Sequence, residues 1–379
     1  MKPRIRILLL TPHLDGGGAE KVIALLAAGL SPDKYEVHLG LMTQAAPPAG
    51  AFPNGVTVHG LAAGRVRAGA IKLLRLVRRL KPRVVLSGMF HLNFLVLLLR
   101  PLFPAGTCVL IRQNGSLSAS LAFHRLPFYT RLLYRLLYRR ADRVICQSAA
   151  MAAELGAALA VSADRLAVLP NPVEVDALRA RVADLPSLWS GLGSGHGSGP
   201  GPHLLAVGRL ASEKGFDQLL QAMVAVRMQF PSADLVIAGA GPEEAPLLEL
   251  RRNLDLDAAV SFAGHVAEPF RFYPGATAFV LSSHHEGLPN ALLEAAAAGL
   301  PIVTTPASQG LVDLLGTRPG VWLAADSSSA ALTTALLQAL RSLQAAQRFP
   351  HTFIDAFRLD RAVAAFEHLI DATCEERQL

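Results

Sequence analysis

At Ser282-Ser283-His284-His285-Glu286-Gly287-Leu288-Pro289-Asn290-Ala291-Leu292-Leu293-Glu294-Ala295 the sequence passes from a strand pattern to a helix pattern. The apolar run 276–281 precedes this segment and predicts a buried strand, and an alanine-rich run follows it. Loops between a parallel strand and the next helix are where α/β sheets bind phosphorylated ligands. Glu286 lies in this loop, and if a helix begins near Pro289, Glu294 lies about one and a half turns along it. The two carboxylates can then reach different parts of one ligand.

The composition indicates a folded protein of two domains. The chain has 379 residues, of which 51% are hydrophobic and 17% charged, and this excludes disorder. The apolar run 94–99 is too short to cross a bilayer, and residues 1–10 have a basic head followed by only four consecutive apolar residues. We therefore expect a first strand there rather than a signal peptide. The three cysteines, Cys108, Cys146 and Cys374, fit a reducing cytosol and not a disulfide framework.

The positive charge is concentrated in one half of the chain. Residues 1–190 contain 24 Lys and Arg against 10 Asp and Glu, a net charge of +14, whereas residues 191–379 contain 12 against 19, a net charge of −7. A strongly basic half is attracted to anionic surfaces such as phospholipid, lipid diphosphate or nucleic acid. A solvated basic surface without a partner is the alternative.

Strand patterns and helix patterns alternate along the chain, which predicts parallel sheets in an α/β fold. The first strand, Ile5–Leu10, is followed by a glycine loop with Gly16, Gly17 and Gly18, and then by a helix pattern from Lys21 to Leu30. Such a loop brings backbone N–H groups and a positive helix end to an anion. It is not the GxGxxG of dinucleotide-binding folds, and glycines also form ordinary tight turns.

Three segments of the first half combine basic and apolar residues. Residues 65–81 predict a basic amphipathic helix, and residues 92–102 and 125–140 add apolar surface with further arginines. Helices of this kind can lie on anionic lipid. A helix that covers a sheet and has a charged outer face shows the same pattern, so both interpretations stay open. Together the three segments favour peripheral contact of the first domain with a membrane.

The second half repeats the alternating pattern and places polar residues after its strands. Arg209 and Lys214 follow the strand 204–207, and two cations there can clamp a diphosphate from two directions. The loops Gly239–Glu243 and Gly264–Val266 follow the next two strands. Two sheets with such loops, facing one another across a cleft, predict a nucleotide-diphosphate ligand held mainly by the second half.

These motifs resemble those of the family 4 glycosyltransferases, which have the two-domain GT-B fold. The resemblance covers nearly the whole chain and is most specific at the Glu-x7-Glu pair of Glu286 and Glu294. It implies two Rossmann-like β/α/β domains, residues 1–170 for the acceptor and residues 171–356 for the nucleotide sugar, with the C-terminal helix, residues 357–379, packing back on the first domain. The other motifs that carry it are Gly16-Gly17-Gly18-Ala19-Glu20, Val207-Gly208-Arg209-Leu210 with Lys214, and Gly239-Ala240-Gly241-Pro242-Glu243.

The resemblance implies a retaining transfer of a hexose or N-acetylhexosamine from a nucleotide sugar, expected to be UDP-linked, to a lipid-linked or cell-surface glycan. No cofactor and no obligatory metal ion are expected. The segment 286–295 looks most like that of bacterial enzymes that extend lipid-linked or surface glycans, among them lipopolysaccharide and exopolysaccharide. The protein is then expected in the cytoplasm, peripherally associated with the inner face of the membrane.

The family motif assigns a role to each matching residue. Arg209 and Lys214 are expected to hold the diphosphate and to stabilise the leaving group, and Glu286, the third expected catalytic residue, binds the sugar hydroxyls. Glu294 is expected to bind the ribose. The other expected donor-binding residues are Gly17 and Gly18 on the phosphates, His265 and Val266 near the base, and the loop Gly287, Leu288, Pro289 and Asn290, which offers backbone N–H groups to the sugar and phosphate.

Some positions depart from the family pattern. Many members have a histidine where a strand of this chain ends in Arg112, so the acceptor-side contact is expected from His91, Arg112 or Asn114. Asp255 and Asp257 superficially form the Asp-x-Asp of metal-dependent transferases. They precede a strand rather than follow one, and we interpret them as solvated.

Three other functions stay open from the sequence: a sugar-nucleotide epimerase on the same fold, a nucleotide-sugar-binding protein without catalysis, and a nucleic-acid-binding protein. The basic and apolar first domain argues against the epimerase, because that reaction needs no membrane contact. The complete set of Arg209, Lys214, Glu286 and Glu294 argues against an inactive site. No stacking platform or nucleic-acid motif is visible, so no nucleic-acid partner is expected.

Overall fold

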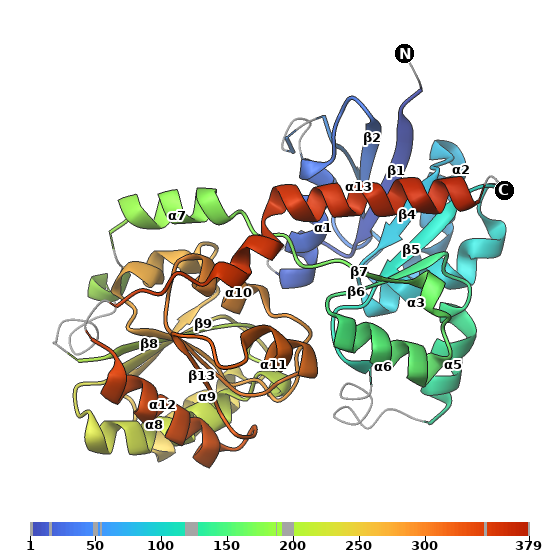
Figure 1. Ribbon diagram of the computed structural model, residues 1–379. Helices are drawn as coiled ribbons and strands as arrows, with labels where there is room; N and C mark the ends of the chain where they lie inside the picture. The colour runs from blue at the N-terminus through green and yellow to red at the C-terminus, as the bar shows by residue number, and fades with distance from the viewer. Residues whose placement is uncertain are drawn as a thin grey trace. The chain divides into compact units, whose positions relative to one another are not determined.

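The computed structural model describes residues 3–14, 17–47, 52–53, 55–117, 128–186, 188–191, 201–344 and 347–377. The chain divides into two compact units: unit 1 comprises Met1–Pro172 and Ala356–Leu379, and unit 2 comprises Val173–Asp355. Each unit is built on one parallel sheet flanked by helices (Figure 1). The predicted α/β class, with two Rossmann-like domains, is confirmed.

Unit 1 contains a seven-stranded parallel sheet in the order β3-β2-β1-β4-β5-β6-β7. The central strand β1 is a nearly continuous apolar run whose residues Ile7 to Leu10 are fully buried, as expected for a parallel strand covered on both faces. Leu8 of this strand lies beside His38 on one side and Val85 on the other. The strands are β1 (Ile5–Thr11), β2 (Tyr35–Leu41), β3 (Thr57–Gly60), β4 (Val84–Ser87), β5 (Cys108–Arg112), β6 (Arg143–Cys146) and β7 (Leu166–Val168).

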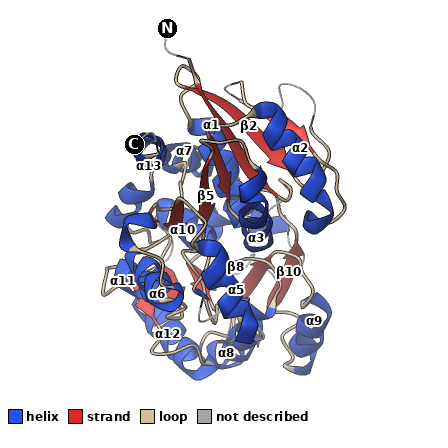
Figure 2. Cartoon of the chain, turned by 90° about the vertical axis from the view of Figure 1, so that its right-hand side faces the viewer, coloured by secondary structure: helices blue, strands red, loops and turns tan. Residues whose placement is uncertain are grey.

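Helices cover both faces of this sheet (Figure 2). One face packs against α1 (Gly18–Gly29) and α13 (Leu359–Glu376). The other packs against α2 (Ala70–Leu80), α3 (Phe90–Leu99), α5 (Phe128–Tyr138) and α6 (Ala149–Leu159). No helix of the described residues is long and apolar enough to cross a membrane.

The basic helix expected over residues 65–81 is shorter than predicted. Residues Val66–Gly69 form a 3-10 turn, and α2 begins only at Ala70. Gly69, a poor helix former, is the N-cap of α2, and a Cβ there would lie 2.6 Å from Met42 Cε. Of the predicted segment 125–140, residues 125–127 lie outside the described part of the chain, and the rest forms α5 and the two residues after it.

Helix α13 returns the end of the chain to unit 1, beside α1 (Figure 1). Val363, Phe366 and Ile370 are buried in the core that α1 and the sheet also form. Lys34 Nζ lies 2.5 Å from Asp371 Oδ2, and Arg83 Nη2 donates to the carbonyl oxygen of Cys374 at 2.7 Å. All three cysteines are buried free thiols.

Two histidines, the buried His38 on β2 and the half-buried His59 on β3, form a polar pair. His38 Nδ1 lies 3.0 Å from His59 Nε2, and His38 Nε2 lies 3.0 Å from Glu36 Oε1, which in turn pairs with Arg6. If His38 donates to Glu36 while neutral, its Nδ1 must accept from His59, so a second proton on His38 breaks this chain. Burial, with the nearby His38 and Arg79, lowers the pKa of His59 to about 4, and burial also lowers the pKa of His38.

We therefore expect unit 1 to lose stability on acidification. The folded pKa of His59 lies below its unfolded value near 6.5, so its contribution is complete above pH 6.5 and is lost as the pH falls toward 4. Calorimetry of wild type should show a loss of about 1 to 2 kcal/mol between pH 7 and pH 5, after allowance for solvent screening. In His59→Gln, which has no titratable ring, this loss should be smaller. An unchanged pH slope in that variant would refute the assignment.

Unit 2 contains a six-stranded parallel sheet in the order β10-β9-β8-β11-β12-β13. Its strands are β8 (His203–Val207), β9 (Asp234–Ala238), β10 (Val260–Gly264), β11 (Ala278–Leu281), β12 (Ile302–Thr304) and β13 (Val321–Leu323). Its helices are α7 (Val175–Asp184), α8 (Phe216–Gln229), α9 (Glu244–Asn253), α10 (Asn290–Ala297), α11 (Gln309–Leu315) and α12 (Ser329–Ser342).

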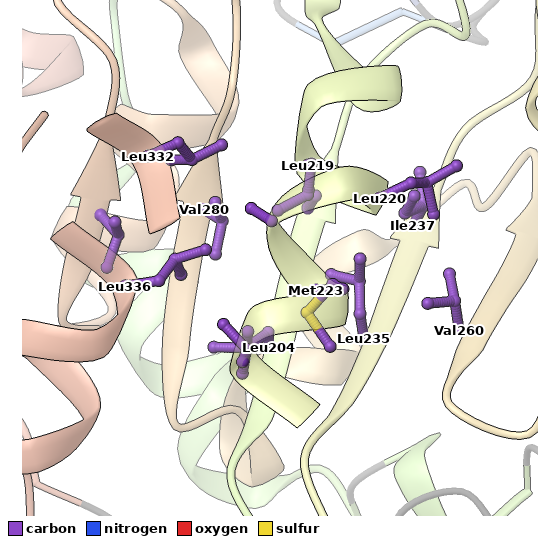
Figure 3. Packing of buried hydrophobic residues seen from close by; sticks show 14 of the residues in the cluster. Leu204, Leu219, Leu220, Met223, Leu235, Ile237, Val260, Val280, Leu332 and Leu336 are labelled. Atoms are coloured by element: carbon purple, nitrogen blue, oxygen red, sulfur yellow. The ribbon is translucent and has the colours of Figure 1, made fainter. Parts of the chain in front are cut away.

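The core of unit 2 lies between the sheet and α8, with α12 beside α8 (Figure 3). Leu219 and Met223 of α8 point to the strands, where they meet Leu204 and Leu235. This packing holds the strand ends, and the loops that follow them, on a rigid base. Within the described ranges, 3-10 turns are formed by Val66–Gly69, Arg100–Leu102, Ala163–Arg165, Leu188–Gly191, Ser212–Lys214, Pro269–Gly275 and Thr352–Phe357.

Candidate functional site

The candidate site of unit 2 lies at the carboxyl ends of β8 and β11. These strands are neighbours in the sheet, so the loop 208–215 after β8 and the loop 282–289 after β11 lie side by side. Each loop leads into the amino end of a helix, α8 or α10. This is the edge at which parallel sheets bind anionic ligands.

Lys214 and Glu286 meet at this edge. Lys214 Nζ lies 2.5 Å from Glu286 Oε1, and the same oxygen accepts a hydrogen bond from Ser283 Oγ at 2.8 Å. The side chains are 22% and 12% exposed, so the pair is accessible to a ligand but largely shielded from water. The ion pair aligns two groups of opposite charge that were predicted to bind neighbouring parts of the donor.

Hydrogen bonds join the two loops and fix this pair. Ser282 Oγ donates to the carbonyl oxygen of Lys214 at 2.9 Å, and the backbone N–H of His284 donates to the carbonyl oxygen of Glu213 at 2.9 Å. On the other side, the N–H of Glu286 donates to the carbonyl oxygen of Ala307, in the loop after β12, at 3.0 Å. Hydrogen bonds between the loops after β8, β11 and β12 therefore fix the backbone that carries Lys214 and Glu286.

Arg209 is the exposed cation of the site. Its side chain is 66% exposed, and its Nη2 lies 2.7 Å from Glu213 Oε1. Burial alone would raise the pKa of Glu213, but the hydrogen bond from Arg209 and the backbone hydrogen bond hold that pKa below its usual range. Glu213 was missed from the sequence; its spacing of four residues from Arg209, in a loop, was the available signal. Because Glu213 stays ionised, it keeps its ion pair with Arg209, and this pair orients the guanidinium group at the loop 208–215.

Two glycines allow the loops to approach closely. Gly215 has φ +59°, and a Cβ there would lie 2.2 Å from the carbonyl oxygen of Ser282. A Cβ at Gly239, in the loop after β9, would lie 1.8 Å from the carbonyl oxygen of Gly208. Larger residues at either position would push the neighbouring strand end away.

The loops after β9 and β10 extend the same edge. The N–H of Gly239 donates to the carbonyl oxygen of Gly264 at 2.8 Å, and the N–H of Glu243 donates to that of Leu210 at 2.9 Å. His265, next to Gly264, is exposed, and Val266 is half-buried. Both lie on the same edge of the sheet as Arg209, separated from it by the β9 loop.

The start of α10 requires one correction. Pro289 is the N-cap residue of α10, as predicted, but proline has no backbone N–H and cannot donate one to a ligand. Gly287 and Leu288 are buried, and Ser308 Oγ donates to the carbonyl oxygen of Gly287 at 2.9 Å. In α10, Asn290 and Glu294 are half-buried. The carboxylate of Glu294 adds to the raised pKa of Tyr273, which burial causes in the first place.

In unit 1, the glycine segment lies where β1 leads into α1. Gly17 is the N-cap of α1 and Gly18 its first residue, whereas Gly16 lies outside the described residues. Glu20 is buried, and its carboxylate lies against Gly17: a Cβ at Gly17 would be 1.8 Å from Glu20 Oε2. His13 Nε2 lies 3.8 Å from Glu20 Oε1. His13 was missed from the sequence, since one histidine in a turn gives no signal of its own.

The acceptor-side candidates lie at the carboxyl ends of β4 and β5. His91 is exposed at the start of α3, and Asn114 donates to the carbonyl oxygen of Gly88. Arg112 is only 1% exposed, and its Nη2 donates to Asn171 Oδ1 at 2.6 Å and to the carbonyl oxygen of Leu169 at 3.1 Å. Burial lowers the pKa of Arg112 to about 10. In this structure its guanidinium holds the segment that leads out of unit 1.

The chemistry of the unit 2 site suits an anionic ligand with a hydroxyl-rich part. Two cations, backbone N–H groups and the start of α10 attract negative charge, and Glu286 can accept hydrogen bonds from hydroxyls. Among the described residues, no group of three or more His, Cys, Asp or Glu side chains could hold a metal ion. Asp257 pairs with Arg251 at 2.7 Å.

Two protein-family models match the chain. The model described as glycosyl transferase 4-like domain matches residues 17–172, and the model described as glycosyl transferases group 1 matches residues 201–342. Each match lies almost wholly within one unit of the structure.

Two curated relatives and one solved structure are similar to this chain. An uncharacterized glycosyltransferase of Haemophilus influenzae is 38% identical over 112 residues, 30% of this chain and 32% of the relative, so this chain spans about a third of it. The Campylobacter jejuni N-acetylgalactosamine-N,N'-diacetylbacillosaminyl-diphospho-undecaprenol 4-alpha-N-acetylgalactosaminyltransferase is 25% identical over 317 residues, 80% of this chain and 81% of the relative. Sucrose-phosphate synthase from Thermosynechococcus elongatus superposes with a TM-score of 0.81 at 18% identity, over 97% of this chain and 99% of that chain.

Proposed function

The chain belongs to the family 4-type glycosyltransferases of the GT-B fold, and we propose that it transfers a hexose or N-acetylhexosamine from a UDP-sugar, with retention, to a lipid-linked or cell-surface glycan. The observation that carries this proposal is the Lys214–Glu286 pair at the joined ends of β8 and β11. It puts a phosphate-binding cation next to a hydroxyl-binding carboxylate, as a sugar diphosphate requires.

Arg209 and Lys214 serve the leaving group in this proposal. When the bond between sugar and diphosphate breaks, negative charge develops on the diphosphate, and cations held in place stabilise it without reorganisation. Glu286 holds Lys214 at a largely shielded position, and Glu213 pairs with Arg209 at an exposed one. Two cations at this edge can supply the neutralisation that a metal ion supplies in other transferases, so we propose a reaction without an obligatory metal ion.

The carboxylates position the donor rather than transfer protons. Glu286 would accept hydrogen bonds from the sugar hydroxyls, and Glu294, about one and a half turns after Pro289, would accept them from the ribose. The N–H groups of Gly287 and Leu288 would face the sugar and phosphate. Gly17 and Gly18 would contact the phosphates from unit 1, and His265 and Val266 would lie near the base.

The acceptor is proposed to be anchored in a membrane. The Campylobacter relative is named for transfer to an acceptor on diphospho-undecaprenol, and the basic half of this chain, with a net charge of +14, is suited to an anionic surface. His91 and Asn114, at the strand ends of unit 1, are the side chains that would contact the acceptor. Arg112 is buried and would stabilise the end of β5 next to Asn114 through its hydrogen bond to Asn171.

Thermal-shift measurements with nucleotides test the donor site. UDP at 100 times its Kd should stabilise the wild type by about 2.7 kcal/mol, because a ligand of the folded state shifts the equilibrium. Arg209→Ala and Lys214→Ala should each weaken UDP binding by roughly tenfold or more, since each removes a charge-assisted contact to the diphosphate.

Arg252→Ala is the matched control, because Arg252 is an exposed arginine at the far end of α9. It should bind UDP as the wild type does. Equal UDP binding in all four proteins would contradict the proposed diphosphate site. Formation of a 2-epimer from the donor alone, without transfer to any acceptor, would favour an epimerase instead.

A further inference from the structure

Unit 1 has a cavity of about 430 Å³ at the edge of its sheet opposite the acceptor-side candidates. Arg100, Arg140 and Arg377 line it, together with Phe103 and Thr107 among others. Thr107 directly precedes β5 and Arg140 precedes β6, so the cavity lies at the amino ends of these strands. Neither the donor site nor the acceptor side uses these residues.

The cavity has more positive than negative charge. Arg100 Nη2 lies 2.6 Å from Asp142 Oδ1, and Arg377 Nη1 lies 2.9 Å from Asp142 Oδ2. The second oxygen also accepts from the N–H of Val109 at 2.6 Å, so three donors already contact this carboxylate. Arg140 is exposed, and its guanidinium has no partner among the described residues. Two guanidinium groups therefore share one carboxylate, and the third, that of Arg140, adds a further positive charge at the cavity.

The charges around the cavity favour an anion. Burial, together with the neighbouring Arg377 and Arg165, lowers the pKa of Arg100, although Asp142 opposes the shift. A guanidinium group has five N–H donors, and only Nη2 of Arg100 donates to Asp142. A phosphate in the cavity would pair with the remaining donors in the forked geometry that arginine prefers.

Exposed leucines lie close in sequence to residues that line the cavity. Leu98 at the end of α3, Leu102 in the turn after it and Leu136 in the last turn of α5 are 60%, 48% and 56% exposed. Each lies within four residues of Arg100 or Arg140 along the chain. Cations beside exposed leucines are the combination by which a protein surface binds an anionic lipid interface.

We propose that this arginine cavity binds the phosphate of an anionic lipid headgroup, while these exposed leucines enter the interface. The leucines favour a lipid over free phosphate, because a soluble ion gives no reason to expose apolar side chains around its site. The inference rests on the proposed function in that a membrane-anchored acceptor requires the enzyme at the lipid surface.

Vesicle co-sedimentation tests the proposal, with phosphatidylglycerol mixed into phosphatidylcholine and with pure phosphatidylcholine. Wild type should bind the anionic vesicles more tightly. Arg140→Glu should bind them roughly 30-fold more weakly, since a charge reversal next to an anionic membrane removes two elementary charges of attraction. Leu136→Glu should bind about tenfold more weakly, because it loses apolar burial in the interface.

Two control variants make the same changes on unit 2. Arg252→Glu reverses an exposed arginine, and Met228→Glu replaces a methionine that is 81% exposed. Both should bind vesicles nearly as the wild type does. Losses as large as those of Arg140→Glu and Leu136→Glu would mean that only net charge and surface polarity matter, and would overturn the proposal.

A second arm separates lipid from free phosphate. If inorganic phosphate raises the Tm of wild type but not of Arg140→Glu, while both bind vesicles equally, the cavity takes a soluble anion and the lipid proposal is wrong. UDP binding is measured on the same variants. Loss of vesicle binding with intact UDP binding supports the proposal, and absent vesicle binding in wild type would overturn it without touching the donor site.

Discussion

Glu286→Gln should reduce the rate of sugar transfer at least about 100-fold, while the affinity for UDP changes by less than about threefold. Glutamine has nearly the shape of glutamate and can still accept from Ser283, so the loop 282–289 should keep its path. It loses the charge that holds Lys214 and that binds the donor hydroxyls most strongly. Initial rates of UDP release and calorimetric UDP titrations measure the two quantities separately.

Glu268→Gln is the matched control for this variant. Glu268 also pairs with a cation, Arg181, but it is 43% exposed and follows β10, outside the loops after β8 and β11 that hold Lys214 and Glu286. Its loss should leave transfer unchanged. A Glu286→Gln enzyme with more than a tenth of the wild-type rate would show that Glu286 has no essential contact with the sugar.

Gly215→Ala should lower the free energy of unfolding of unit 2 by about 3 kcal/mol and should also weaken UDP binding. An alanine at φ +59° is strained, and its Cβ would lie 2.2 Å from the carbonyl oxygen of Ser282. The collision separates the two loops that hold Lys214 and Glu286 together. Urea denaturation followed by tryptophan fluorescence reports on this unit, because Trp189 and Trp322 both belong to it.

Gly316→Ala is a control for the loss of a positive-φ glycine outside the two loops. Gly316 has φ +50° and ψ −135°, a region that is essentially restricted to glycine, and a Cβ there would meet no atom within 4 Å. The variant should cost about 1 to 3 kcal/mol of backbone strain and leave UDP binding intact. Equally weakened UDP binding in both variants would mean that the loss in Gly215→Ala does not come from the close approach of the two loops.

Much of the fold could be predicted from the sequence because its strands are buried on both faces. A continuous apolar run such as Ile7–Leu10 indicates such a strand directly, and β1, β8 and β11 were found in this way. Short strands such as β13, only three residues long and half-buried, give no comparable signal. The break before α2 lies at Gly69, beside Met42, and residue spacing does not show this contact.

The candidate site could be predicted only in part. Strand–loop–helix patterns located Arg209, Lys214 and Glu286 at one edge of a sheet, because neighbouring parallel strands end together. The pairing of Lys214 with Glu286, 72 residues apart in sequence, and the support of Arg209 by Glu213 depend on three-dimensional contacts. Arg112 was expected to face a ligand, but the structure buries it against Asn171, since its length lets it reach the departing chain. The roles of these residues in binding and transfer stay predictions.

The return of α13 to unit 1 has a consequence for the order in which the protein can be completed during synthesis. Unit 2 ends at Asp355, so all of its residues are made before the last helix. Unit 1 lacks Val363, Phe366 and Ile370 of its core until that helix has emerged. Unit 1 is therefore started first and completed last. Until α13 has been made, the apolar side of α1 and of the sheet that α13 covers stays exposed while the chain is still on the ribosome.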